Sequence, residues 1–212
     1  MTGSETDQDD AVVSLTPEGI AADPECLTRI LDTPAGRLVL RLLRPTDAGL
    51  LGRYLEGLSL ATRQLWAPHA FDRDTAARLC AELVVARSLR FVGEMSRQDE
   101  PELVAYFIVA LEGRPSELQR YSDRGQHLQP SLTCLLAPSV ADCYQSQGLG
   151  SLIMPPLLET ARSLGRRYMV LMGGVQARNL RAIRFYEKFG FRRMGDFVVR
   201  DLDNHDMMLD LA

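Results

Sequence analysis

Residues 145–151, Gln-Ser-Gln-Gly-Leu-Gly-Ser, are the stretch of this sequence best suited to chemistry with a ligand. An extended run ends at Val140, and an apolar run typical of a helix follows Gly150. The first backbone N–H groups of a helix have no partners within it and carry the positive end of its dipole. Glycines let a ligand approach such groups closely, so the stretch predicts a phosphate site. A tight strand-to-helix turn explains the same glycines equally well.

Three known phosphate motifs fit this stretch poorly. A P-loop requires Gly-Lys-Ser/Thr, and no glycine in the chain precedes a lysine. A Rossmann fingerprint requires a third glycine where Ile153 stands, and an early strand of a parallel unit. A kinase requires a lysine strand and an aspartate loop downstream, and too little chain remains to hold them.

The stretch resembles the first signature of the GNAT acyltransferase superfamily, Gln/Arg-x-x-Gly-x-Gly/Ala, at residues 145–150. Residues 179–191, NLRAIRFYEKFGF, resemble its second signature, and residues 40–51, LRLLRPTDAGLL, its opening strand and first helix. The resemblance covers roughly residues 37–211. It implies acetyl-CoA, or another acyl-CoA, as cofactor.

The same resemblance implies which residues bind CoA. These are Val140, Gln145, Ser146, Gln147, Gly148, Leu149, Gly150, Ser151, Asn179, Ala182 and Phe185. Backbone N–H groups of the turn would bind the pyrophosphate without a metal, and a bulge at Val140 would expose backbone groups for the pantetheine arm. Arg162, Arg166 or Arg167 could reach a phosphate, although a solvated helix face explains each of them better.

Tyr186 stands in the second signature at the position that the resemblance implies is the proton donor to the leaving thiolate. A phenol with a pKa near 10 holds its proton at neutral pH and can therefore act as such a donor. A core aromatic beside Phe185 and Phe189 is the competing interpretation.

The general base is not evident. Many members of the superfamily carry a glutamate on the strand before the glycine turn, but residues 132–140, LTCLLAPSV, have no carboxylate. Glu94, Glu112, Asp142 and His127 are candidates elsewhere, each more typical of a surface residue. A water chain, or an acceptor that arrives as the free amine, would serve as well.

The acceptor pocket is expected from residues 53–72 and 113–130. Trp66 and His69 stand out, because an aromatic ring beside a histidine can line a pocket. Equally, Trp66 could pin the loop to the core and His69 could cap the region of Asp72. The four cysteines include no C-x-x-C pair and only three histidines accompany them, so no metal site is expected.

Composition places the chain among globular proteins with one core: 212 residues, 46% hydrophobic and 25% charged. Residues 1–34 hold eight acids and one base, which predicts an acidic, poorly ordered arm before a single domain at 35–212. Alternating strand-like and helix-like runs predict an α/β (α+β) fold. The resemblance implies the GNAT fold, a mixed central sheet of about seven strands with helices on both faces. Pro155 and Pro156, inside the expected helix, predict a local bend.

Two functions remain open at this stage. The first is an N-acyltransferase that moves an acetyl or other short acyl group from acyl-CoA to an amine of a small molecule, protein or peptide by direct transfer in a ternary complex. The second is a non-catalytic CoA-binding sensor or interaction module. The sequence has neither the clustered basic charge of a nucleic-acid surface nor an apolar run of membrane length, so we expect no nucleic acid or membrane partner and a cytoplasmic location. The sequence is also compatible with a homodimer.

Overall fold

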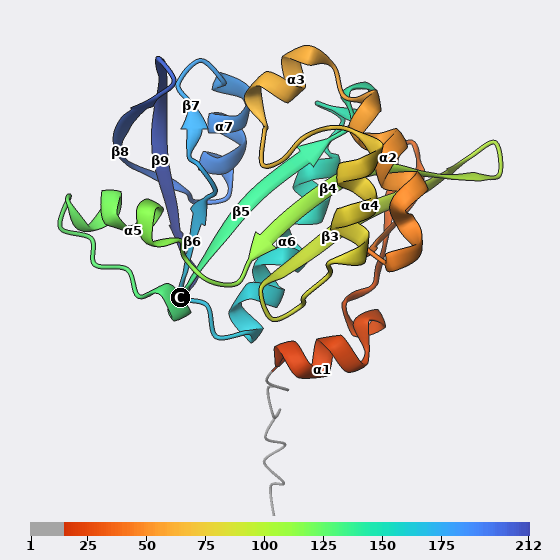
Figure 1. Cartoon of the computed structure of the whole chain (residues 1–212), viewed down its shortest axis with the longest axis horizontal. Coiled ribbons are helices and arrows are strands. Elements are labelled where there is room, and N and C mark those ends of the chain that lie inside the picture. The colour runs from red at the N-terminus through yellow and green to blue at the C-terminus, as the bar shows by residue number, and fades with distance from the viewer. Residues whose placement is uncertain (1–14) are drawn as a thin grey trace, which may run out of the picture.

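The computed structural model describes residues 15–212, which form one mixed sheet with helices on both faces (Figure 1). Its strands are β1 (Arg29–Thr33), β2 (Gly36–Leu42), β3 (Ser88–Arg97), β4 (Glu100–Ala110), β5 (Thr133–Val140), β6 (Tyr168–Leu171), β7 (Val175–Gln176), β8 (Arg192–Val199) and β9 (Leu202–Asp210). Its α-helices are α1 (Pro17–Ala22), α2 (Ala48–Gly57), α3 (Leu60–Leu65), α4 (Arg73–Ala81), α5 (Pro115–Ser122), α6 (Leu149–Ser163) and α7 (Leu180–Lys188).

The sheet order is β1-β2-β3-β4-β5-β6-β9-β7, with β8 paired to β9. Among the strands of residues 15–212, only β5 and β6 run parallel, because α6 carries the chain back between them. The mixed sheet with helices on both faces confirms the expected fold. The described residues form nine strands instead of about seven, because the analysis of the sequence did not anticipate β1 and the two-residue β7.

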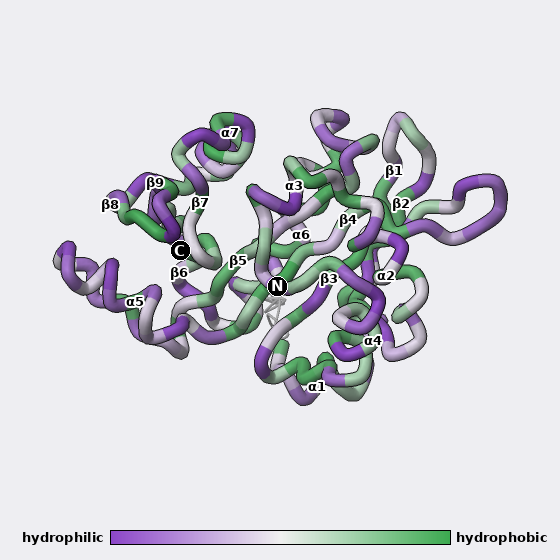
Figure 2. The backbone as a smooth tube through the Cα atoms, turned by 45° about the horizontal axis from the view of Figure 1, so that its top comes forward, coloured by the Kyte–Doolittle hydropathy of each residue, from purple (hydrophilic) through white to green (hydrophobic). Residues whose placement is uncertain are grey.

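Two apolar layers enclose the sheet. Alternate residues of the central strands point to opposite faces. On β5, Cys134 and Leu136 belong to the core under α6 and α7, whereas Ala137 belongs to the core under α2 and α4. Figure 2 shows hydrophobic stretches along the central strands β3 and β4. This arrangement leaves the two ends of the sheet free to carry loops.

The chain before residue 35 differs from the predicted arm. Residues 17–33 form α1, a 3-10 turn and β1, which pairs with β2 from Arg29↔Leu40 to Thr33↔Gly36. Ile20 and Leu27 are buried in the main core. The acidic composition of residues 1–34 predicted poor order, and two apolar side chains among many acids give no pattern that would indicate burial. Residues 1–14 lie outside the described residues, so that part of the predicted arm stays a prediction.

Two other segments contain helices that the sequence does not indicate, because its patterns predict a connection at residues 59–72 and a long polar loop or insertion at 113–130. Residues 59–72 include α3, which is capped by the Ser59 hydroxyl. Residues 113–130 include α5, which buries Leu118 and Tyr121 and is polar elsewhere. Helix α6 runs through Pro155 and Pro156 as one element; the bend expected there stays a prediction.

Candidate active site

Strands β5 and β6 diverge in the middle of the sheet. They pair only as far as Leu136↔Leu171, and the last bond runs from the Met172 N–H to the Leu136 carbonyl at 2.9 Å. Strand β5 continues to Val140 alongside β4. The Ala141 N–H bonds the Val104 carbonyl, so by alternation the backbone groups of Val140 face the gap left by β6. An extended ligand can pair with this edge as an added strand.

Pro138 lies at the same edge. Its nitrogen points into the gap as well, so no ladder hydrogen bond is lost there. The β4–β5 register runs without a shift from Ala105↔Val140 to Ala110↔Leu135. The expected bulge at the end of β5 is therefore wrong, and the exposed backbone results from the divergence of β6 instead.

The glycine turn begins α6. Gly148 is its N-cap with φ 88°, a left-handed conformation that favours glycine, and the first helical bond runs from the Leu152 N–H to the Gly148 carbonyl at 3.1 Å. The N–H groups between them have no partner within the helix. A Cβ on Gly148 would meet nothing within 4 Å, so the space above this backbone is open. The turn can thus accept an anion from that side.

Gly150 serves a different purpose. A Cβ there would lie 3.1 Å from the Phe185 ring. Glycine at this position therefore lets α6 approach α7, the helix that carries the second signature. The Asn179 side chain caps α7 by accepting from the Ala182 N–H at 3.2 Å. The two signatures are thus brought side by side by packing.

A cleft of about 790 Å³ runs from this turn along the free edge of β5. Most of the predicted residues line it: Trp66, Val140, Gln145, Ser146, Gly148, Leu149, Gly150, Ser151, Asn179, Ala182, Phe185 and Tyr186. Gln147 does not, and its amide donates to the Cys143 carbonyl at 2.5 Å. The Gln145 amide donates to the Val140 carbonyl at 2.9 Å and so helps to shape the turn. The volume suits a small-molecule site.

Lys188, the single lysine of the sequence, is the last residue of α7, and its side chain reaches the first turn of α6. Its Nζ donates to the Ser151 hydroxyl at 3.0 Å. An ammonium group beside unpartnered N–H groups adds to the positive potential of the turn. Arg162, Arg166 and Arg167 do not line the cleft; Arg162 donates to the Leu211 carbonyl at 2.8 Å.

Tyr186 reaches the cleft from α7. Its ring packs against Phe185 and Phe191, with centroids 5.4 and 5.5 Å away. Burial raises the pKa of the phenol above its usual value, so the hydroxyl stays protonated at neutral pH. Among residues 15–212 the hydroxyl has no hydrogen-bond partner. Tyr186 therefore packs as a core aromatic, and its hydroxyl is left able to donate a hydrogen bond.

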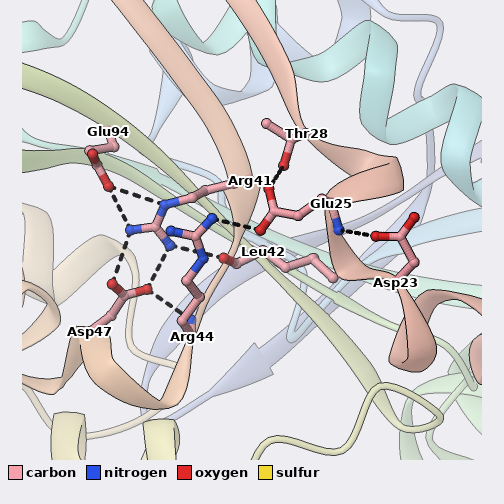
Figure 3. A network of polar contacts seen from close by, with 8 residues as sticks. All are labelled: Asp23, Glu25, Thr28, Arg41, Leu42, Arg44, Asp47 and Glu94. Atoms are coloured by element: carbon pink, nitrogen blue, oxygen red, sulfur yellow. Dashed lines mark hydrogen bonds and ion pairs between the residues drawn. The ribbon is translucent and has the colours of Figure 1, made fainter.

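None of the four candidate bases lines the cleft. Glu94 accepts from the buried Arg41 guanidinium at 2.6 Å, in a network that Figure 3 shows together with Asp47. Glu112 and His127 are both exposed, and the His127 Nδ1 lies 3.0 Å from the Ser122 hydroxyl. These three candidates therefore lie outside the cleft.

Asp142 is the candidate nearest to the cleft in the chain. Its carboxylate accepts from the Ser59 N–H and hydroxyl and from the Thr62 hydroxyl, at 2.7 to 2.9 Å. Burial raises the pKa of Asp142, but these hydrogen bonds outweigh it and the net pKa is lowered. Asp142 therefore joins α3 to the end of β5 and is a poor proton acceptor.

Trp66 and His69 belong to one aromatic cluster with Tyr106. Trp66 contacts the other two rings edge-on, at 5.6 and 5.8 Å between centroids. His69 lines an adjoining recess instead of the cleft. Its Nδ1–H donates to the Ala70 carbonyl at 2.7 Å, and burial lowers the pKa of the imidazole. His69 is thus neutral at pH 7, and the cluster pins this loop to the sheet.

Several cleft residues were missed from the sequence because no local motif marks them. Ser139 of β5 accepts from the Tyr54 hydroxyl at 2.9 Å, and Arg114 precedes α5. Arg200 and Asn204 come from the β8–β9 hairpin. The Tyr54–Ser139 bond joins residues 85 positions apart, so only the fold brings these two together.

Glu117 supports the wall of the cleft from behind. Its Oε1 accepts from the Gly173 N–H at 2.6 Å, while Oε2 is buried without a partner among residues 15–212. Burial raises the pKa of this carboxyl. Gly173 and Gly174 have φ of 71° and 70°, and both line the cleft. Helix α5 thereby fixes the turn between β6 and β7.

Two searches of residues 15–212 have negative results. No group of three or more His, Cys, Asp or Glu side chains in this region could hold a metal ion. No helix of the same region has both the length and the apolar character needed to cross a membrane.

A family model described as "Acetyltransferase (GNAT) family" matches residues 63–191. That range spans more than half of the chain and includes the glycine turn, the free edge of β5 and α7. The chain belongs to the GNAT acetyltransferase family. No curated protein sequence matches it.

Solved GNAT structures share the fold at low sequence identity. The GNAT domain of PAT from S. lividans is 16% identical with a TM-score of 0.68, and the match covers 88% of this chain and 98% of that one. The protein yncA from Salmonella typhimurium, solved with its cofactor acetyl-CoA, is 20% identical with a TM-score of 0.59, over 82% and 94%. RimJ from Mycobacterium smegmatis, solved with CoA-disulfide, is 17% identical with a TM-score of 0.61, over 86% of each chain.

Proposed function

We propose that this GNAT protein is an N-acyltransferase that moves an acetyl or other short acyl group from acyl-CoA to an amine. The observation that carries the proposal is the continuity of the cleft. It joins the open backbone at Gly148, the free edge of β5 at Val140 and the Tyr186 hydroxyl. The structures of yncA with acetyl-CoA and of RimJ with CoA-disulfide support CoA as the ligand.

Each part of the cleft suits one part of acyl-CoA. The N–H groups at Leu149 and Gly150, with the Lys188 ammonium beside them, suit the pyrophosphate. The edge at Val140 suits the amides of the pantetheine arm. No metal is needed for either contact. Acyl-CoA, when bound, supplies an activated acyl thioester.

Tyr186 is the proposed proton donor to the leaving thiolate. Burial raises the pKa of the phenol, so its oxygen holds a proton at neutral pH. In this proposal the hydroxyl donates a hydrogen bond to the departing sulfur and passes its proton to it, and water returns a proton to the phenol oxygen. The residues that line the cleft include no carboxylate or histidine. The amine therefore loses its proton to water, or arrives neutral, in this proposal. Transfer is direct because the cleft lining presents no cysteine nucleophile.

The cleft without a carboxylate also suits a second candidate, a CoA-binding module without turnover. Release of free thiol from acetyl-CoA, measured over a panel of amines, separates the two. Thiol release that depends on an amine, with the acetylated amine identified by mass spectrometry, is the expected result. CoA binding without release on any amine would leave the second candidate standing.

A further inference from the structure

A second recess adjoins the cleft on the face of the sheet covered by α2 and α4. Pro68, Arg114 and Met172 line both spaces, so the cleft and the recess meet at these residues. The recess measures about 680 Å³ and lies between α4, β3 and the loop that carries His69. The cofactor does not account for it, because the glycine turn and α7 lie against the other face.

The charge of the recess is one-sided. Four arginines line it, Arg78, Arg87, Arg90 and Arg114, against one carboxylate, Glu82. None of the four has an ion-pair partner within 4.0 Å among residues 15–212. Unpaired guanidinium groups that share a concave space repel one another, and an oxyanion relieves that repulsion by accepting paired N–H bonds.

Arg114 stands where the recess meets the cleft. Its Nη2 lies 3.4 Å from the Met172 sulfur, and Met172 follows directly after β6 at the point of divergence. Arg90, on β3, donates to the Tyr106 hydroxyl and is half-buried, so its guanidinium is held in place. A molecule whose amine lies at the divergence of β5 and β6 can therefore present a second group to these arginines.

We infer that the acceptor is a small amine that also carries a carboxylate or phosphate, bound in this recess by Arg114 with Arg90 behind it. The inference rests on the proposed function, because it names the acceptor class of the same site. An amine without an anionic group leaves the four arginines uncompensated. A polycationic amine or a basic peptide adds repulsion to them.

The first test needs no turnover. Binding of an N-acetyl amino acid and of its neutral amide is measured by calorimetry on the CoA-bound protein. The acid should bind roughly 10–100-fold more tightly, the value of a charge-assisted hydrogen bond at a guanidinium. The preference should fall at high ionic strength. N-acetyl phosphoethanolamine against N-acetylethanolamine tests phosphate in the same way.

Arg114→Gln should remove most of this preference while leaving CoA affinity unchanged. Arg53→Gln is the matched control, because Arg53 is an exposed arginine of α2 that lines neither space and has no ion pair among the described residues. It should behave like the parent protein. Arg114→Lys should keep part of the preference, since it retains the charge and loses the paired geometry.

Three results would overturn the inference. They are equal binding of the acid and the amide, no binding of either to the CoA-bound protein, and a loss of CoA affinity in Arg114→Gln, which would assign Arg114 to the cofactor. Absence of thiol release on every amine would count against the proposed function alone, because product binding is measured without turnover.

Discussion

At the scale of single residues, Gly148 makes the clearest prediction for the cofactor. Gly148→Val should abolish or strongly weaken CoA binding, because a branched side chain would fill the open space above the N–H groups. It should also cost about 1–2 kcal/mol of stability, because φ is 88° there. Calorimetric titration with CoA and denaturant unfolding measure the two effects separately.

Gly165→Val is the matched control for this change. Gly165 lies past the other end of α6 with φ 71° and nothing within 4 Å of its Cβ position, and it does not line the cleft. It should lose similar stability and keep its CoA affinity. Ser146→Ala, in the turn itself, should change CoA affinity little. Equal CoA affinities in the two valine variants would contradict the phosphate site.

Tyr186→Phe should lower turnover by roughly 10²–10⁴-fold, the range for loss of a positioned acid. CoA affinity should stay close to that of the parent, because the ring and its packing remain. The loss should appear in kcat as well as in kcat/KM, since the proton is needed only as thiolate charge develops. Steady-state kinetics on any acceptor from the amine panel make the measurement.

Tyr121→Phe is the control for Tyr186→Phe, because it should affect stability and leave turnover unchanged. Its hydroxyl is also buried but donates to the Met207 carbonyl at 3.1 Å, outside the cleft. This variant should lose about 1 kcal/mol of stability and keep turnover. Unchanged turnover in Tyr186→Phe would remove this hydroxyl from the mechanism and leave protonation of the thiolate to water.

At the scale of elements, one buried carboxylate of β9 pairs with arginines of α5 and of the turn after it, beside the bond from the Tyr121 hydroxyl to the Met207 carbonyl. Asp206, which is 0% exposed, accepts from Arg120 at 2.7 Å and from Arg124 at 2.9 Å. Arg120 also stacks 3.9 Å above the Phe197 ring. Asp206→Asn should cost about 3 kcal/mol, because it breaks a buried pair whose arginines can still reach water. Hydrogen exchange should show α5 opening first.

Asp196→Asn is the comparison for that element. Asp196 pairs with Arg193 but is 58% exposed, so its loss should change stability by less than about 1 kcal/mol. An equal effect of the two variants would mean that Asp206 does not anchor α5. The Glu117 carboxylate, on the same helix, supports Gly173, so a loosened α5 should also lower turnover.

Elements with a clear apolar pattern could be predicted from the sequence, and others could not. Apolar runs predict strands at residues 90–95, 102–111 and 132–140, and β3, β4 and β5 begin and end within a few residues of these ranges. The helices of the two signatures, expected to end near residues 164 and 189, end at Ser163 and Lys188. The sequence also predicts a helix that runs from Asp72 or Asp74 toward Arg87, whereas α4 ends at Ala81. Helix α5 was missed because Leu118 and Tyr121 are its only buried apolar residues, too few for a periodic pattern.

The candidate site could likewise be predicted only where it lies in local motifs, because contacts between distant segments leave no local pattern in the sequence. The glycine turn and Tyr186 lie in local motifs that the sequence displays. Arg41 and Glu94 are 53 residues apart, so nothing local indicated that Glu94 is engaged in an ion pair. The recess arginines Arg78, Arg90 and Arg114 come from three separate parts of the chain, and only the sheet brings them together.

At the scale of the whole molecule, the proposed CoA site is built from elements that are far apart in the sequence. The cleft is bounded by β5, α6, α7, the loop after α3 and the β8–β9 hairpin. A ligand that binds only the native state must raise its stability by mass action. CoA at 100 times its dissociation constant should add about 2.7 kcal/mol, and the melting temperature should rise by roughly 5–10 °C for a chain of this size.

The same rise is expected in EDTA and in magnesium, because backbone N–H groups and Lys188 supply the proposed phosphate contacts. Dephospho-CoA should retain most of the shift, since the proposed contacts are to the pyrophosphate and the pantetheine arm. Adenosine should produce almost none, because it reaches neither the glycine turn nor the edge at Val140. A shift that appears only with magnesium would mean that the phosphates are held through a metal, and Gly148 would then lose the role proposed for it.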